Sequence, residues 1–233
     1  MSKKILISVI LFSSILFLSA CSKQEPKRID YSQNLNKNNN LINNNQKNMI
    51  ELNKEEMINR DVLKKYSQAE FQTSEGNFTI EFFNEKMPET VANFLNLAES
   101  GYFDGIKFHR VIADFMIQGG DPLTKNDSMV AMWGTGGPGY AIADEHVVDP
   151  ELSNLRGTIS MANSGPNSGG SQFFINVKDN TFLDFDKEPL SSKHPVFGKI
   201  ISGMDVVDSI SLIDTDGSDR PMKDVIIEKI TLK

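Results

Sequence analysis

The stretch FHRVIADFMIQGGD, residues 108–121, surrounds one histidine, one arginine and one glutamine with apolar residues and ends in a Gly-Gly-Asp turn. Alternate side chains of a strand share a face, so Phe108 and Arg110 are predicted to point the same way on one strand. Met116 and Gln118 are predicted to share a face on the next strand. An isolated arginine beside apolar surface commonly lays its methylenes along the core edge and keeps its guanidinium in water. This stretch alone therefore leaves a functional role for Arg110 open.

A second stretch, MANSGPNSGGSQFFINV at residues 161–177, favours such a role. It is too rich in glycine and asparagine for a helix, yet it opens and closes on strand-like apolar residues. Together the two stretches resemble the cyclophilin family of peptidyl-prolyl isomerases, and the resemblance covers roughly residues 69–233. The motifs follow the family's order and spacing: FHRV at 108–111, FMIQGGD at 115–121, GTGGPGY at 134–140, MAN at 161–163, GPNSGGSQFFI at 165–175 and VFGK at 196–199.

The rest of this region combines short strand patterns with two helical ones. Alternating runs on either side of residues 74–77 predict a hairpin, residues 88–101 and 204–213 predict amphipathic helices, and residues 225–232 predict a closing strand. Many short strands with two helices indicate a mainly β domain built as a closed antiparallel barrel. The resemblance to cyclophilins implies that this barrel has eight strands and that the two α-helices cap it.

Composition excludes several other classes of protein. The 233 residues are 39% hydrophobic, which is enough for one large domain. A net charge of -7 and a pI near 5.1 argue against a nucleic-acid surface, because that would need a basic stripe. The single cysteine rules out an intrachain disulfide. Three histidines without metal-ligand spacing give no ligand set, so neither a metal nor a cofactor is expected.

Two short motifs indicate other chemistries but lack the context that these need. Residues 134–139, GTGGPG, match the GxGxxG pattern of dinucleotide-binding loops without a clean helix start after it. The serine-rich residues 164–171 do not place a serine at the centre of a GxSxG nucleophile elbow. The first motif is interpreted as a loop beside the substrate groove, and the second is not expected to form a catalytic triad.

Residues 1–20 have the pattern of a bacterial lipoprotein signal peptide. Two lysines precede an apolar run, residues 5–18, which is too short to span a bilayer and is followed by small residues. The sequence Leu18-Ser-Ala-Cys21 resembles the lipobox, which implies cleavage before Cys21 and diacylation of this residue. We expect an extracytoplasmic protein, lipid-anchored to a bacterial membrane, either the outer membrane facing the periplasm or the cell surface. The alternative is an ordinary secretory signal with a coincidental cysteine.

Residues 21–48 contain few apolar side chains and are crowded with asparagine. They are predicted to form a flexible, disordered tether, which as a coil would hold the following domain about 30 Å from the membrane. Residues 49–68 are predicted to form a short amphipathic helix or linker, capped by Asn53. Ile58, Val62 and Tyr66 recur every four residues and are predicted to share one face of it. Whether that face packs on the domain or binds a partner is open. The isomerase domain is predicted to span residues 69–233.

Isomerisation of an X-Pro bond needs no nucleophile, only a group that binds the twisted amide better than the planar one. The prolyl nitrogen of a twisted amide accepts a hydrogen bond, and an arginine keeps its charge at any working pH, so Arg110 is the candidate catalytic residue. Gln118 is predicted to hold the guanidinium in place by hydrogen bonding. The resemblance implies a substrate-binding set of Phe115, Met116, Ala162, Asn163, Gln172, Phe174, Phe182, Leu183 and His194.

The chain departs from the family pattern after Phe174. Where many members have a tryptophan before Leu-Asp, this chain has Phe182, which has no indole N–H to donate. Cyclosporin is therefore expected to bind weakly. An insertion at residues 184–193 separates Leu183 from His194, which puts the place of His194 in the site in doubt.

These observations predict a monomeric peptidyl-prolyl cis-trans isomerase that acts on unfolded or partly folded proteins with X-Pro bonds, without a covalent intermediate. Two other classes stay open. One is a chaperone-like binding module for Pro-containing segments, and the other is a surface adhesin or scaffold that works through residues 49–68. A pure binder has no need of a group that recognises only the twisted amide, so the presence of Arg110 with Gln118 favours the enzyme.

Overall fold

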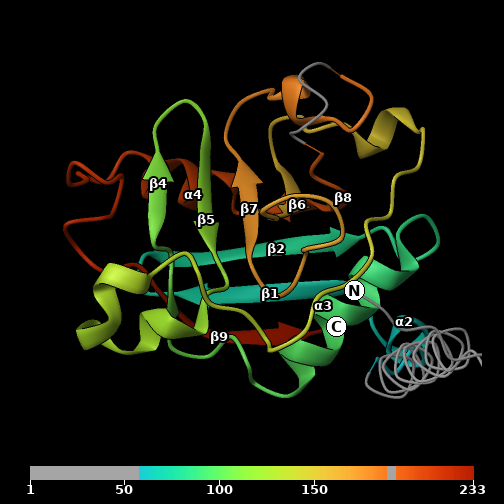
Figure 1. Ribbon diagram of the computed structural model, residues 1–233, viewed down its shortest axis with the longest axis horizontal. Coiled ribbons are helices and arrows are strands. Elements are labelled where there is room, and N and C mark those ends of the chain that lie inside the picture. The colour runs from blue at the N-terminus through green and yellow to red at the C-terminus, as the bar shows by residue number, and fades with distance from the viewer. Residues whose placement is uncertain (1–57, 188–192) are drawn as a thin grey trace, which may run out of the picture. The chain divides into compact units, whose positions relative to one another are not determined.

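The computed structural model describes residues 58–187 and 193–233. In this part of the chain, nine strands form one antiparallel sheet in the order β3-β9-β1-β2-β8-β6-β7-β5-β4 (Figure 1). The strands are β1 Gln68–Thr73, β2 Gly76–Phe82, β3 Ile106–Lys107, β4 Arg110–Ile112, β5 Met116–Gly119, β6 Thr158–Met161, β7 Phe173–Asn176, β8 Val196–Ser202 and β9 Ile226–Leu232. The α-helices are α2 Val62–Lys65, α3 Pro88–Glu99 and α4 Met204–Ser211. The fold is mainly β, with a curled sheet and few helices.

Strands β1 and β2 form the predicted hairpin. Alternate residues of both strands are buried, as in an antiparallel sheet with one face on a core. Phe71 stacks on its register partner Phe78 with ring centroids 4.7 Å apart. Phe94 of α3 and Phe173 of β7 pack against Phe71 as well. The main core is therefore an aromatic cluster between the sheet and α3.

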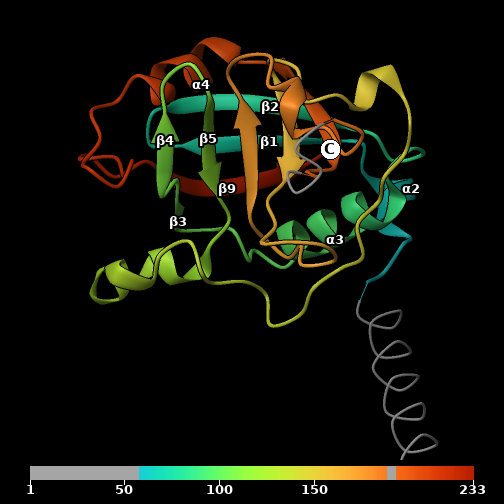
Figure 2. The same cartoon turned by 45° about the horizontal axis from the view of Figure 1, so that its top comes forward.

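Helices α3 and α4 lie at opposite ends of the curled sheet (Figure 2). Helix α3 begins at Pro88, whose fixed φ suits a first turn, and the chain after it reverses at Gly101 with φ 71°. Two of its first backbone N–H groups donate to the carboxylate of Glu145, which stabilises the positive end of the helix. Helix α4 follows Gly203, where a Cβ atom would lie 2.4 Å from the carbonyl oxygen of Asn77. Both predicted helices are confirmed.

Strand β7 separates the main core from a second apolar cluster, because its alternate side chains point to opposite faces. Phe173 and Ile175 belong to the main core. Phe174 lies on the other face, in a cluster with Met116 and Leu183. All four residues of β7 are consequently buried, although the strand carries a polar residue at its end.

The predicted closed, eight-stranded barrel is not confirmed, because the described strands number nine and their order is open, with β3 and β4 at the two edges. The segment that contains β3 and β4 changes its pairing partner between two neighbouring residues. The N–H of Phe108 donates to Val225 next to β9, at 2.9 Å, whereas the N–H of His109 donates to Gln118 of β5, at 3.0 Å. The one predicted strand is thereby divided into β3 and β4. These two short strands stand at opposite edges of the sheet but are close in sequence, so the sheet must curl to bring its edges near each other.

This division also makes one prediction about side chains wrong. Phe108 lies in the main core and is 1% exposed, as is Val111. Because Val111 faces the core, Arg110 points to the other face, so Phe108 and Arg110 do not share a face. The alternation within β5 is as predicted, since Met116 and Gln118 both lie away from Ile117, which is in the main core.

The residues before β1 pack on the domain. Within the described part of the predicted helix, α2 has one turn, and Ile58 and Val62 are buried with Tyr66 packed against the same core. This apolar face is covered by the domain itself. Residues 49–57 with Asn53, the predicted tether and Cys21 lie outside the described residues. None of the helices within residues 58–187 and 193–233 combines the length and apolar character needed to cross a bilayer.

Candidate active site

The second apolar cluster forms a floor on the face of β5 and β7. Met116, Phe174 and Leu183 are its buried members, and Phe115 and Ala162 pack against them. The β5–β7 register explains the arrangement, because Phe174 lies directly opposite Gln118 and two residues from the partner of Met116. Leu183 comes from the one-turn 3-10 helix Thr181–Leu183 that follows β7.

Arg110 stands at the edge of this floor, opposite Gln118 in the β4–β5 ladder. Its side chain is 43% exposed, and its Nε atom lies 3.6 Å from a carboxylate oxygen of Asp219. Gln118 does not hold the guanidinium as predicted. Its Nε2 atom donates instead to Oε1 of Gln172, at 3.1 Å, and within the described residues no hydrogen bond joins it to Arg110. Gln172 lies just before β7, which pairs with β5 on the side away from β4, so the amide of Gln118 is bonded on the β7 side.

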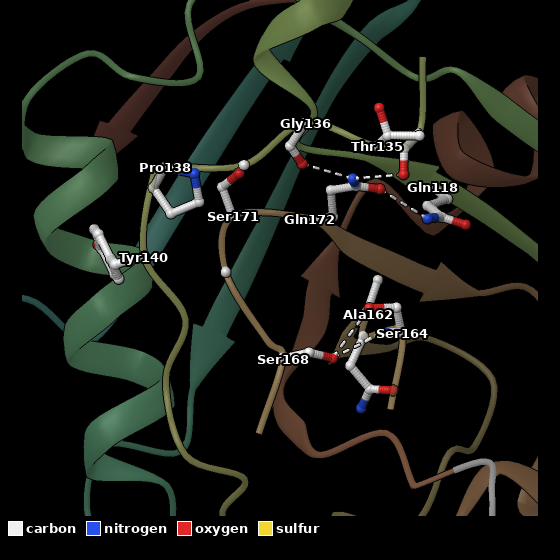
Figure 3. A pocket seen from close by; sticks show the side chains of 14 residues that line it. Gln118, Thr135, Gly136, Pro138, Tyr140, Ala162, Ser164, Ser168, Ser171 and Gln172 are labelled. Atoms are coloured by element: carbon white, nitrogen blue, oxygen red, sulfur yellow. Dashed lines mark hydrogen bonds between the residues drawn. The ribbon is translucent and has the colours of Figure 1, made fainter. Parts of the chain in front are cut away.

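Gln172 links the floor to the glycine-rich residues 134–139, which form the rim of the site. Its Nε2 atom donates to the carbonyl oxygens of Gly134 and Gly136, at 3.0 and 2.8 Å. These groups border a cavity of about 420 Å³, which Gln118 also lines (Figure 3). The rim is held from behind by the fully buried carboxylate of Asp121, which accepts hydrogen bonds from the N–H groups of both glycines. The glycine-rich residues therefore form a loop beside the groove, as the sequence predicts.

Ala162 and Asn163 line the same cavity from the chain after β6. The N–H of Ala162 donates to the carbonyl oxygen of Gln172, at 3.0 Å, which ties the two segments together. Asn163 donates through Nδ2 to the carbonyl oxygen of Lys193, at 2.7 Å. Its Oδ1 atom has no protein donor among the described residues and is available to a peptide N–H.

His194 and Phe182 complete the predicted set. The ring of His194 meets Phe174 edge-on with centroids 5.3 Å apart. The backbone N–H of His194 donates to the carbonyl oxygen of Leu183, at 3.1 Å. The insertion thus does not remove His194 from the site. Burial lowers the pKa of His194 below its ordinary value, so the ring is neutral near pH 7. Phe182 stacks on Phe115 with centroids 6.0 Å apart and is 49% exposed.

Comparison with known proteins decides the family. A family model described as cyclophilin type peptidyl-prolyl cis-trans isomerase/CLD matches residues 68–232. The chain belongs to the cyclophilin family. As a cyclophilin it is a peptidyl-prolyl cis-trans isomerase, and its relatives bear the same description.

Among these relatives, peptidyl-prolyl cis-trans isomerase ppi1 of Schizosaccharomyces pombe is 42% identical over 167 residues, which cover 70% of this chain and 97% of that protein. Peptidyl-prolyl cis-trans isomerase-like 1 of Rhizopus delemar is 43% identical, over 68% of this chain and 86% of the relative. A crystal structure of a Cryptosporidium parvum cyclophilin type isomerase aligns with a TM-score of 0.61 and 33% identity, covering 72% of this chain and 98% of that chain. A similar structure, with a TM-score of 0.60, contains that protein in the presence of the dipeptide Ala-Pro.

Sequence reasoning missed the polar groups that support this cyclophilin's floor. Asn180 donates through Nδ2 to the backbone oxygen of Phe115, at 2.8 Å, and to Asn176. Asn154 donates to the buried carboxylate of Asp184, at 2.9 Å, and to the backbone oxygen of His194, at 3.2 Å. These hydrogen bonds therefore hold the backbone of Phe115 and of His194 on the two sides of the floor. In the sequence these asparagines look like ordinary turn residues, so no local signal separates them from loop positions.

Proposed function

We propose that this cyclophilin isomerises X-Pro bonds in unfolded or partly folded proteins outside the cytoplasm, where diacylated Cys21 anchors it to a bacterial membrane. The catalytic part of the proposal is supported by one observation, the position of Arg110 at the edge of the apolar floor. The cellular part rests on the sequence of residues 1–21, with its single cysteine after Leu18-Ser-Ala. Clients are expected to share a proline and an accessible backbone more than a sequence.

The floor and the guanidinium divide the work. Met116, Phe174 and Leu183 offer an apolar surface to the proline ring, which shields the bond from water. Loss of amide conjugation costs about 18–20 kcal/mol, and the twisted prolyl nitrogen gains a lone pair that the planar amide lacks. A guanidinium that donates to this nitrogen stabilises only the twisted form and so lowers the barrier. The half-exposed side chain of Arg110, next to the floor, supports this role.

The amides beside the floor orient the peptide. Both hydrogens of Gln172 Nε2 are directed to rim carbonyls, and Gln118 donates to one lone pair of Gln172 Oε1, so Gln172 offers a substrate N–H the second lone pair of this oxygen. Asn163 presents Oδ1 in the same way. Two acceptors on one side of the proline pocket fix the direction of the chain without reading its side chains.

The rival function is chaperone-like binding, in which the same groove holds Pro-containing segments and turnover is incidental. A role as adhesin or scaffold through residues 49–68 is disfavoured by the described part of that segment, whose apolar face packs on the domain. A change at Arg110 separates catalysis from binding, because only catalysis needs the twisted amide.

We expect Arg110→Ala to lower kcat/KM on an Ala-Pro peptide by roughly 10²–10³, by comparison with loss of one oxyanion donor. Proline-limited refolding of a client should slow in parallel, while peptide binding measured by calorimetry should change little. Arg60→Ala is the matched control, because Arg60 pairs with Glu89 on the surface at 2.6 Å. Near-normal turnover by Arg110→Ala would rule out this mechanism.

A further inference from the structure

Among the described residues, Asp219 is the only acidic residue whose carboxylate lies within 4 Å of the Arg110 guanidinium, and no sequence pattern points to it. The Nε atom of Arg110 lies 3.6 Å from Oδ2 of Asp219, and the two side chains are 43% and 47% exposed. The backbone oxygen of Asp219 accepts from the N–H of Val111, at 2.8 Å. This second contact fixes the backbone of Asp219 against the residue that follows Arg110 in β4. The carboxylate is therefore held beside the guanidinium by a backbone bond as well as by charge.

The loop that carries Asp219, residues 214–222, is tied to itself. A β-bridge joins Thr215 to Pro221, and the N–H of Asp216 donates to the carbonyl oxygen of Arg220 at 2.8 Å. The carboxylate of Asp216 accepts from the N–H groups of Ser218 and Arg220. An ordered loop costs little entropy when Asp219 engages its partner, because its backbone is already fixed.

The backbone of Asp219 has a φ of 61°, in the left-handed region. Only glycine, asparagine and aspartate adopt this conformation at low cost. Glycine would suit the turn equally well, yet the position carries a carboxylate that faces Arg110. The choice of aspartate over glycine is accounted for if the carboxylate has a role.

We propose that Asp219 is a positioning residue that holds the guanidinium of Arg110 in its catalytic orientation, the role that the sequence assigns to Gln118. The carboxylate approaches the Nε edge, and within the described residues no protein acceptor bonds Nη1 or Nη2 of Arg110. Both terminal nitrogens are left to the substrate, one for the prolyl nitrogen and one for a neighbouring carbonyl. This inference rests on the proposed role of Arg110.

An ion pair between half-exposed groups contributes little to stability, so a structural role and a positioning role predict different results. Asp219→Asn keeps a side chain that tolerates the left-handed backbone, and Asp219→Gly keeps the backbone without the side chain. We expect both variants to melt close to the unmodified protein and to lose about tenfold in kcat, with KM little changed, because a misplaced catalytic group costs rate more than binding. Asp214→Asn removes the same charge from the same loop, and the exposed Asp214 side chain has no partner among the described residues. This control should retain full turnover.

A double-mutant cycle with Arg110→Ala completes the test. If Asp219 acts through Arg110, Asp219→Asn has no further effect in the Arg110→Ala background. Losses that multiply, normal kcat in Asp219→Asn and Asp219→Gly, or an equal loss in Asp214→Asn would each overturn the inference while leaving the role of Arg110 intact. An active Arg110→Ala variant would instead refute the proposed mechanism, and the inference with it.

Discussion

His109 is buried next to Arg110, and neither of its ring nitrogens has a hydrogen-bond partner among the described residues. Burial lowers its pKa from 6.5 to about 4, while the nearby Asp121 carboxylate acts in the opposite direction and Arg110 and Arg220 act in the same direction as burial. The ring is therefore neutral under ordinary conditions. A neutral imidazole keeps a second positive charge away from the guanidinium.

The lowered pKa of His109 makes stability depend on pH. The unfolded chain binds a proton at this residue near pH 6.5, and the folded chain near pH 4. The contribution of neutral His109 to the free energy of unfolding is therefore complete above pH 6.5 and is lost as the pH drops toward 4. A difference of this size amounts to about 3 kcal/mol over the window. Urea titrations of the unmodified protein and of His109→Gln between pH 7 and 4.5 measure it. The variant should show the shallower slope, and equal slopes would contradict the assignment.

We expect Phe182 to determine the sensitivity to cyclosporin. Phenylalanine stacks on Phe115 but offers no donor, and a lost hydrogen bond to a buried acceptor costs about 1–3 kcal/mol. We expect cyclosporin to bind roughly 10- to 100-fold more weakly than to members with tryptophan at this position. Phe182→Trp should tighten inhibition and leave turnover of small peptides unchanged, as measured by titration in a peptide assay. Nanomolar inhibition of the unmodified protein would show that the donor is not needed.

At the scale of elements, the glycine-rich rim, residues 134–139, takes its shape from Asp121, a residue elsewhere in the chain. A Cβ atom on Gly136 would lie 2.1 Å from Oδ1 of Asp121, the buried carboxylate that holds the rim. Residue 136 must therefore be glycine while the rim keeps its present path. Gly137, next in the chain, has nothing within 4 Å of such an atom.

Gly136→Ala is expected to push the rim away from Asp121 and to break the hydrogen bond from Gln172 to Gly136. Because Gln172 is proposed to orient the peptide in the ground state and the transition state alike, KM should rise about tenfold with a smaller change in kcat. Gly137→Ala should have a much smaller effect on both constants. Steady-state kinetics on a tetrapeptide series separates the two, and a fall confined to kcat would argue against this role for the rim.

Elements with a regular period could be predicted from the sequence, and those set by distant partners could not. The β1–β2 hairpin, α3, α4 and β9 follow local alternation or helical spacing. The break between β3 and β4 depends on which strand each N–H meets, and no local pattern records that choice. In the same way the motifs locate Arg110 and the floor, whereas Asp219 and Asn180 reach them through the fold. From the sequence alone, the acidic residues 214–222 would be assigned to an ordinary solvent-exposed loop, because nothing in them indicates that Arg110 is a neighbour.

At the scale of the whole molecule, we expect the proposed lipid anchor to decide where the isomerase meets its clients. The predicted lipobox and tether lie outside the described residues and rest on the sequence alone. Acyl chains contribute about 0.8 kcal/mol per buried methylene, so a diacylated cysteine anchors stably where one chain would be marginal.

Cys21→Ala is therefore expected to block lipidation and processing, leaving an uncleaved precursor or a misprocessed soluble form. Detergent phase separation and intact-protein mass spectrometry measure both outcomes. Turnover by the released domain should match that of the anchored protein, because the site is built from residues after 108. An unchanged mass with continued partition into detergent would refute the lipobox.

The first strand of the domain lies between β2 and the last strand, β9, with Phe71 paired to Ile230. A ribosome or a translocation channel therefore delivers β1 long before its second partner exists. Until β9 arrives, one edge of β1 exposes unpaired backbone groups, a ready template for intermolecular pairing. Such non-local closure also raises the contact order, which slows folding. This isomerase is thus itself exposed to aggregation during synthesis, and limited proteolysis of arrested nascent chains would show whether protection appears only once β9 has emerged.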